Sequence, residues 1–569
     1  MSTPYSPGSK PCAAGAPLAL AMLLLLTVGA ARAQLSLPPD YAWRQLSPPG
    51  EVGSSVRSLW KIDPRGEWVV FVGDVENAGA EAVYAMRRNG AALHRLSAYG
   101  APGSIAELLL SGDGRRVFYL GDLETDGRNE LWSAPIPGTP ASAVKLNVAV
   151  QGQGVEHWSV PASGERLVYA AEGVEEYGFW SVPLAGPAAA SVRLDPGLTP
   201  GESFVGTAIS PEGARAFLVL GDIAGQTSRI WSAPIDGPIG SGLFLFDESS
   251  TSCFATGGAV PSGSSRFFYL LSCDTPSGNR INQAWSVPLA GPAAAAVSLA
   301  GSFVAGGAIA SAAFSSDGEF FVFRADKSVD DQFDLWSVPL AGPLAELVRL
   351  NPLLVGSGDV TSRYTISPDS SRVAYVADQT TDETFRAWSV PISGPSGSAT
   401  SLVSGILPLN RDVTSLEFTP DSATVVFRAD FAEDERFDLY SVPADGSAFQ
   451  DQITNDSSVP GPIRAVGSSW RLHPDGARVA YIFDESAPGD SRGLGEQRLS
   501  PRYIQDAQLN GDPVAGGRIF SFAVFPDSAG TIYFSDELID ERWHLFTVDS
   551  RIFGDGFEEG TTAAWPDAP

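Results

Sequence analysis

The thirteen residues Ile366-Ser-Pro-Asp-Ser-Ser-Arg-Val-Ala-Tyr-Val-Ala-Asp378 contain the pattern on which the whole chain is built. A Ser-Pro-Asp-Ser segment comes first, an apolar run follows, and an acidic residue closes the stretch. Proline presets the backbone φ of a turn and aspartate hydrogen-bonds to nearby backbone, so the first part predicts a tight turn. The β-branched and aromatic residues after it predict a strand.

The same pattern recurs along the chain at a nearly constant step. Related stretches end at Asp74, Asp122, Glu172, Asp222, Asp274, Asp326, Asp430, Asp484 and Asp536. With Asp378 in its place, successive acids stand 48 to 54 residues apart. Ten copies at so regular a spacing indicate a repeat architecture.

A second element follows the acid by about ten residues in nine of the ten units, and the ninth unit has only Gly493-Leu494 there. Its clearest copy is Leu335-Trp-Ser-Val-Pro-Leu-Ala-Gly342, and it recurs around Trp132, Trp180, Trp231, Trp285, Trp388 and Tyr440, with weaker copies at Tyr84 and Phe546. A short strand such as Glu346-Leu-Val-Arg-Leu350 comes next. Each unit therefore predicts four antiparallel strands, which we call a, b, c and d. Four-stranded units repeated around a ring form a β-propeller, an all-β fold.

The two ends of the repeat region predict how the ring closes. The last unit has a strand c at Trp543–Val548 but no clear strand d, whereas Trp43-Arg-Gln-Leu46 precedes the first strand a. Pairing these two segments would cover both open edges. We therefore predict one closed ring of about ten blades, with the N-terminal strand completing the last blade. Two smaller tandem propellers are the alternative, because propellers typically have about four to eight blades.

These units resemble the TolB-like β-propeller repeat of exported bacterial proteins. The resemblance rests on Ser367-Pro-Asp-Ser, Thr419-Pro-Asp-Ser and His473-Pro-Asp-Gly, on the acid that closes strand b, and on the Leu-Trp-Ser-Val element. It covers roughly residues 52 to 549. It implies a periplasmic scaffold or an accessory domain of a peptidase.

The first 33 residues predict a signal peptide. A short apolar core from Leu18 to Val28 precedes Ala31-Arg-Ala33, which has the small-x-small pattern of a cleavage site. The core is too short to span a bilayer comfortably, although a retained anchor is the alternative. We therefore divide the chain into a signal peptide (1–33), propeller repeats (34–550) and a short C-terminal tail (551–569). We expect a secreted or periplasmic bacterial protein with no membrane span after cleavage.

Signal cleavage would leave two cysteines, Cys253 and Cys273, each ten residues from Gly263. A symmetric hairpin around that glycine would place them opposite each other on paired strands. Export permits a disulfide, so this pair is our disulfide candidate. Two buried thiols on neighbouring strands are the alternative.

Charge and the scattered histidines argue against several functions. With 37 Lys and Arg against 66 Asp and Glu, the net charge is −29, which would repel a phosphate backbone and argues against a nucleic-acid partner. Gly489-Asp-Ser491-Arg-Gly493 matches a nucleophile elbow in letters, but it falls in a b–c loop without the required helix. The four histidines, His94, His157, His473 and His544, fall in different units. We therefore predict no catalytic residues, and we expect a monomer.

The b–c loops of units six to eight are rich in carboxylates. Together they carry twelve acids: Asp326, Asp330, Asp331, Asp334, Asp378, Asp382, Glu383, Asp430, Glu433, Asp434, Glu435 and Asp438. Clustered carboxylates suit Ca²⁺, which takes six to eight oxygen ligands. The candidate metal ligands are Asp326, Asp330, Asp334, Asp430, Asp434 and Asp438. The alternatives are a solvated face whose first Asp caps the turn, and a surface that attracts a basic partner.

The leading functional hypothesis is an exported, non-enzymatic scaffold that binds a protein or peptide through its b–c and d–a loops. One alternative is a propeller enzyme, such as a metal-dependent hydrolase or a polysaccharide lyase, with a site at the central channel. Another is a cell-surface structural protein. The repeated strand-c tryptophans are interpreted as packing between blades, because each unit must bury the same face.

Overall fold

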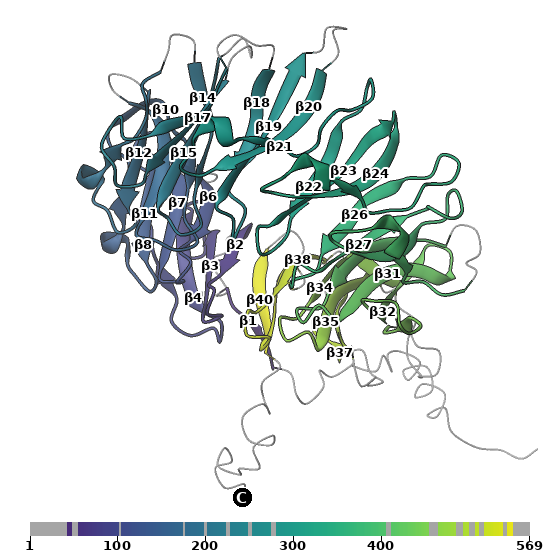
Figure 1. The fold of residues 1–569 in the computed structure, drawn as a ribbon. Coiled ribbons are helices and arrows are strands. Elements are labelled where there is room, and N and C mark those ends of the chain that lie inside the picture. Colours follow the sequence, from purple (N-terminus) through teal and green to yellow (C-terminus); the bar gives the residue numbers. More distant parts are fainter. Residues whose placement is uncertain are drawn as a thin grey trace, which may run out of the picture.

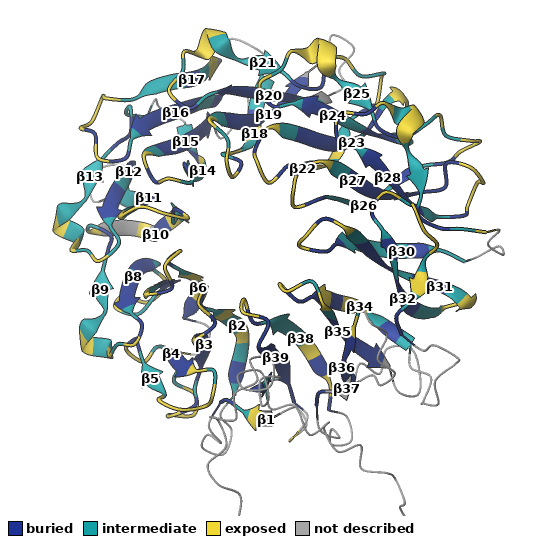
Figure 2. Ribbon diagram, turned by 60° about the horizontal axis from the view of Figure 1, so that its bottom comes forward, coloured by how far each residue is buried: buried dark blue, intermediate teal, exposed yellow. Residues whose placement is uncertain are grey.

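The computed structural model describes residues 42–47, 55–101, 104–173, 177–198, 202–222, 228–248, 253–274, 280–405, 411–454, 465–484, 493–499, 507–510, 517–536, 538 and 543–549. The predicted signal peptide, the C-terminal tail and Ser491 lie outside the described residues. In the part of the chain that the structure describes, forty strands form ten four-stranded antiparallel sheets. They follow one another around a single ring, so the prediction of one ten-bladed propeller is confirmed and the two-propeller alternative is wrong (Figure 2).

The first five blades each contain four strands in chain order. Blade 1 contains β2 (Val56–Ile62), β3 (Trp68–Gly73), β4 (Ala82–Arg87) and β5 (His94–Arg95). Blade 2 contains β6 (Ile105–Leu110), β7 (Arg116–Gly121), β8 (Glu130–Pro135) and β9 (Val144–Lys145). Blade 3 contains β10 (Val150–Ser159), β11 (Arg166–Gly173), β12 (Tyr177–Pro183) and β13 (Val192–Arg193). Blade 4 contains β14 (Glu202–Ile209), β15 (Arg215–Asp222), β16 (Ser228–Pro234) and β17 (Leu243–Glu248). Blade 5 contains β18 (Cys253–Ala259), β19 (Arg266–Asp274), β20 (Arg280–Pro288) and β21 (Val297–Ser298).

Blades 6 to 9 repeat this order, and blade 10 borrows its outer strand from the N-terminus. Blade 6 contains β22 (Ile309–Phe314), β23 (Phe320–Val329), β24 (Gln332–Pro339) and β25 (Val348–Arg349). Blade 7 contains β26 (Val360–Ile366), β27 (Arg372–Ala377), β28 (Arg386–Pro391) and β29 (Thr400–Ser401). Blade 8 contains β30 (Val413–Phe418), β31 (Thr424–Glu433), β32 (Arg436–Pro443) and β33 (Asp451–Gln452). Blade 9 contains β34 (Ala465–Leu472), β35 (Arg478–Asp484), β36 (Gly493–Arg498) and β37 (Ala507–Gln508). Blade 10 contains β38 (Ile519–Val524), β39 (Gly530–Ser535), β40 (His544–Asp549) and β1 (Ala42–Gln45).

Among the described residues, five short 3-10 helices lie in the turns between strands c and d: η1 (Pro140–Ser142), η2 (Ala188–Ala190), η3 (Ala293–Ala295), η4 (Leu344–Glu346) and η5 (Ser396–Ser398). Of the helices that the structure describes, none is long and apolar enough to cross a membrane.

The ring closes as predicted, through β1 and β40. Ala42 is paired with Asp549 and Gln45 with Phe546 in an antiparallel register. Figure 1 shows the two ends of the described chain, purple β1 and yellow β40, side by side. Just after β1, the Ser47 hydroxyl accepts a hydrogen bond from the Leu545 backbone N–H at 3.3 Å. The covered edge leaves no open strand at this seam.

The hydrophobic core lies between neighbouring blades. One cluster, for example, combines Val376 and Ala387 of blade 7 with Phe427 and Val442 of blade 8. The six tryptophans of the strand-c motif belong to such clusters: Trp132, Trp180, Trp231, Trp285, Trp336 and Trp388. This confirms their predicted packing role. Each blade buries the same face against the next one, which is the physical origin of the repeat.

The serine of the Trp-Ser motif joins blades by hydrogen bonds. The Ser133 hydroxyl donates to the Leu184 carbonyl of the next blade at 2.7 Å and accepts from Arg116 Nε at 2.8 Å. Ser232 and Leu289 repeat this bond between blades 4 and 5. The motif therefore supplies both an apolar contact and a polar connection at these interfaces.

Candidate functional site

The antiparallel order of the strands gives the ring two different faces. The a–b and c–d turns lie on one face, which we call the turn face. The b–c turns and the d–a loops lie on the other, which we call the loop face. The acid-rich turns of blades 6 to 8 belong to the loop face.

The acid that closes strand b is a structural residue. In blade 7, Asp378 accepts the backbone N–H of Asp359 at 2.5 Å on one oxygen and that of Glu383 at 3.0 Å on the other. The carboxylate thus connects the start of strand a to the b–c turn. Asp74, Asp326 and Asp430 accept two equivalent backbone bonds in their blades. The need to satisfy these backbone groups explains why an acid recurs at this position.

The structure divides the twelve acids of blades 6 to 8 into two groups. Five are buried, with at most 4% of their surface exposed: Asp326, Asp334, Asp378, Asp430 and Asp438. Seven are exposed: Asp330, Asp331, Asp382, Glu383, Glu433, Asp434 and Glu435. We call these seven the acidic sector. The twelve acids therefore do not form one continuous surface, and only the acidic sector can meet a partner directly.

Three members of the acidic sector occupy a backbone conformation that favours glycine. Asp331, Glu383 and Glu435 have φ values of 61°, 58° and 60°. Gly79 and Gly127, which stand five residues after their own strand-b acids in blades 1 and 2, have φ values of 81° and 71°. All five donate their backbone N–H to that acid. The position five residues after the strand-b acid is thus glycine in blades 1 and 2 and an acid in blades 6 to 8. This exchange appears only when the loops are aligned with one another, so inspection of single loops did not reveal it.

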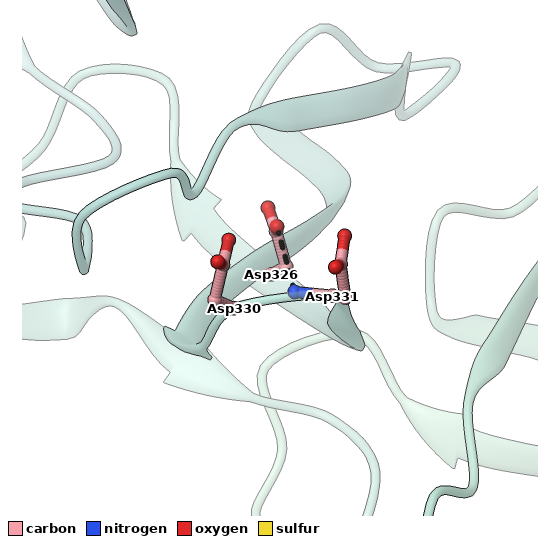
Figure 3. A group of neighbouring side chains, drawn as sticks. All are labelled: Asp326, Asp330 and Asp331. Carbon is pink, nitrogen blue, oxygen red and sulfur yellow. Dashed lines mark hydrogen bonds between the residues drawn. The ribbon is translucent and has the colours of Figure 1, made fainter. Parts of the chain in front are cut away.

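The six predicted metal ligands are not brought to one place. In blade 6, ligand oxygens of Asp326, Asp330 and Asp331 lie within 4.8 Å of one another (Figure 3). This is the one group of three potential ligands among the residues that the structure describes, and Asp331 was not among the predicted ligands. Both Asp326 oxygens already accept backbone N–H bonds, from Ala308 and Asp331. A calcium site stays one of the predictions from the sequence, but these backbone bonds lead us to expect no Ca²⁺-specific binding here.

The other predicted ligands have separate partners. Asp334 accepts a hydrogen bond from Asn351 Nδ2 at 2.7 Å and lies 3.8 Å from Arg349 Nη1. Burial raises the pKa of the Asp334 carboxyl, while Asn351 and Arg349 act in the opposite direction. In blade 8, Asp438 accepts from the Thr454 hydroxyl at 3.2 Å, and Asp434 lies 3.6 Å from Arg411 Nη1.

Two further acids connect neighbouring blades beneath the acidic sector. Asp359 of blade 7 accepts the backbone N–H of Phe333 of blade 6 at 2.7 Å. Asp412 of blade 8 accepts that of Phe385 of blade 7 at 2.8 Å. Burial is the main cause that raises the pKa of each carboxyl. These bonds hold the b–c turns of the three blades in a defined relation.

Among the described residues, ion pairs engage two of the seven members of the acidic sector. Arg436 Nη1 lies 3.4 Å from Glu433, and Arg411 pairs with Asp434. The Glu433 and Asp434 side chains are 68% and 56% exposed, and such pairs contribute little stability in water. The acidic sector therefore keeps a strongly negative surface.

The four histidines lie in four different blades. His473 is fully buried in the a–b turn of blade 9, with Nε2 3.0 Å from Glu496 Oε2. Arg478 Nη1 lies 3.0 Å from the other oxygen of Glu496. His544 Nδ1 lies 3.2 Å from the side chains of Gln45 and Ser47 at the closure seam. The contacts of both histidines are therefore with residues that hold the fold together.

Cys253 and Cys273 are joined by a disulfide in the structure. They are directly paired in the register of strands β18 and β19. The bond connects strands a and b of blade 5 near the loop face.

A polar residue directly after strand d has a structural role that the sequence pattern alone did not predict. In blade 6, Asn351 Oδ1 accepts the backbone N–H of Leu335 in strand c at 2.8 Å. Equivalent bonds are made by Ser47, Ser97, Asn147, Asp195, Thr454 and Asn510. The signal that could have revealed it is a Leu or Ile followed by a small polar residue at the end of each of these units.

Comparisons with known proteins concern the fold alone. No family model matches the chain, and no curated protein sequence matches it. Dipeptidyl peptidase 4 from Porphyromonas gingivalis is similar with a TM-score of 0.44 and 11% identity, over 75% of this chain and 64% of that chain. This chain thus spans less than two thirds of that peptidase. An oligogalacturonate lyase in complex with manganese is similar with a TM-score of 0.31 and 9% identity, over 91% of this chain and 92% of that chain. The oligogalacturonate lyase from Vibrio parahaemolyticus is similar with a TM-score of 0.33 and 12% identity, over 71% of this chain and 98% of that chain.

Proposed function

We propose that this propeller is a scaffold that binds a basic protein or peptide through its loop face. The observation that carries the proposal is the acidic sector, seven exposed carboxylates on the b–c turns of three consecutive blades. Potentials of opposite sign steer a partner towards such a surface and suppress partners of the same sign. The hydrogen bonds of Asp359 and Asp412 keep the sector preorganised, which lowers the entropic cost of binding.

The proposal includes export. The apolar core and the Ala31-Arg-Ala33 cleavage pattern support a signal peptide, and the resemblance to TolB-like repeats supports a secreted or periplasmic scaffold. The enzyme and cell-surface alternatives stay predictions.

The test compares two variants with the same change in charge. The first neutralises one acid in each of three blades of the acidic sector, as Asp330→Asn, Glu383→Gln and Glu435→Gln. The control neutralises three exposed acids near the turn face, as Glu165→Gln, Glu212→Gln and Glu319→Gln. The probe is a fluorescent octalysine peptide, and its dissociation constant is measured by anisotropy at low salt.

We expect the sector variant to bind octalysine at least about tenfold more weakly than the control variant, which is about 1.4 kcal/mol. Added salt should weaken binding to the unmodified protein because the contact is exposed. Equal affinities for the two variants would contradict the proposal, because the attraction would then come from net charge alone.

A further inference from the structure

Three large apolar side chains are exposed in segments next to the acid-rich turns of blades 6 and 7. Val329 at the end of β23 is 53% exposed, and Leu353 and Val355 in the loop between blades 6 and 7 are 76% and 38% exposed. Leu354, between the last two, is partly buried and packs against the core cluster between blades 6 and 7. The apolar run is therefore divided, with one side chain in the core and its two neighbours in solvent.

Hydrogen bonds hold this loop between the b–c turns of two blades. Gln332 Nε2 of blade 6 donates to the carbonyl of Gly358 at 3.3 Å. On the other side, the Ser357 hydroxyl donates to Asp382 of blade 7 at 3.1 Å. Within the loop, the Gly358 N–H donates to the Val355 carbonyl at 2.8 Å. Leu353 and Val355 thus belong to a fixed segment with acidic turns on both sides.

Exposed apolar side chains with a charged rim have the composition of a docking surface. Charge alone mainly raises the rate of encounter, whereas burial of apolar side chains slows dissociation. Leucine and valine exposed to this extent would gain from contact with an apolar partner side chain. The surrounding carboxylates would accept cations on either side of that contact.

We propose that Val329, Leu353 and Val355 form the apolar centre of a docking surface for a basic peptide segment that carries apolar side chains between its lysines or arginines. This inference rests on the proposed function and names the chemistry of its partner. Charge complementarity argues for this occupant over a second copy of the chain, because a two-fold contact would bring the same carboxylates face to face.

The experiment uses two peptides and two pairs of substitutions. One peptide alternates lysine and leucine and the other alternates lysine and serine, so that only their apolar content differs. The test variant is Leu353→Ser with Val355→Ser. The control variant is Ile239→Ser with Phe449→Ser, which removes side chains that are 59% and 80% exposed on c–d turns of the turn face.

We expect the test variant to bind the lysine–leucine peptide at least about tenfold more weakly than the control variant in 0.3 M salt. Both variants should bind the lysine–serine peptide equally. If the test variant keeps full affinity for the lysine–leucine peptide, the docking surface is overturned. The proposed function would survive that result if neutralising the acidic sector still weakened the binding of both peptides. It would fail as well if neutralising the acidic sector changed the affinity of neither peptide.

A second copy as the occupant is tested by sedimentation without peptide. We expect the unmodified protein and the test variant to sediment identically. A dimer that dissociates in the test variant would assign the surface to self-association and overturn the proposal.

Discussion

At the scale of single residues, Asp378 and Asp382 have opposite roles although they stand four positions apart in one turn. Asp378 is 3% exposed and satisfies two backbone N–H groups. Asp382 is exposed and accepts from the Ser357 hydroxyl. The first residue stabilises the blade, and the second belongs to the surface that we propose for binding.

We predict that Asp378→Ala lowers the free energy of unfolding by about 1–3 kcal/mol, because it leaves buried backbone donors without acceptors. Asp382→Ala should change it by less than about 0.5 kcal/mol, as is usual for surface substitutions. Urea unfolding monitored by tryptophan fluorescence measures both values. Equal losses for the two variants would show that burial does not separate their roles.

At the scale of elements, the chain termini meet in blade 10. The four-residue strand β1 covers the edge of β40, and Gln45 and Ser47 surround the His544 ring nitrogen. Closure therefore depends on a segment nearly 500 residues away from its partner in the sequence. Such a pairing joins the first and last blades into one cooperative ring.

Deletion of residues 42–45 should destabilise the protein by about 2–4 kcal/mol, at roughly 1 kcal/mol for each lost ladder hydrogen bond. The uncovered edge of β40 should also promote self-association. Thermal melting and light scattering after size exclusion measure the two effects. Arg44→Ala is the control, because it removes only an exposed side chain that donates to the Asn89 carbonyl. A deletion variant that melts and elutes like the unmodified protein would contradict this role of β1.

At the scale of the whole molecule, the ring gathers the b–c turns of all blades on one face and concentrates part of the −29 net charge there. Carboxylates alone do not make a calcium site. The Asp326 oxygens are engaged by backbone donors, and Asp330 and Asp331 are exposed.

We therefore expect that, after EDTA treatment, 1 mM Ca²⁺ raises the melting temperature no more than 1 mM Mg²⁺ does. A specific ion present at about 100 times its Kd would add roughly 2.7 kcal/mol, which a melting curve resolves. A Ca²⁺-specific rise that disappears in Asp330→Asn with Asp331→Asn would contradict this expectation and locate the ion.

The repeat spacing, the strand order and the closure of the ring follow from local sequence signals. Turn residues and alternating side chains act over a few positions, so they can be recognised in the sequence alone, as Pro368 and the strand after it illustrate. The division of the acids is different. Asp330 and Asp334 stand four positions apart, yet Asp334 in strand β24 is buried because Asn351 and Arg349, fifteen or more positions away, fold against it. Leu353 is exposed and Leu354 is partly buried for the same reason: burial depends on which distant strands pack against each side of the chain, and only the assembled blades determine that.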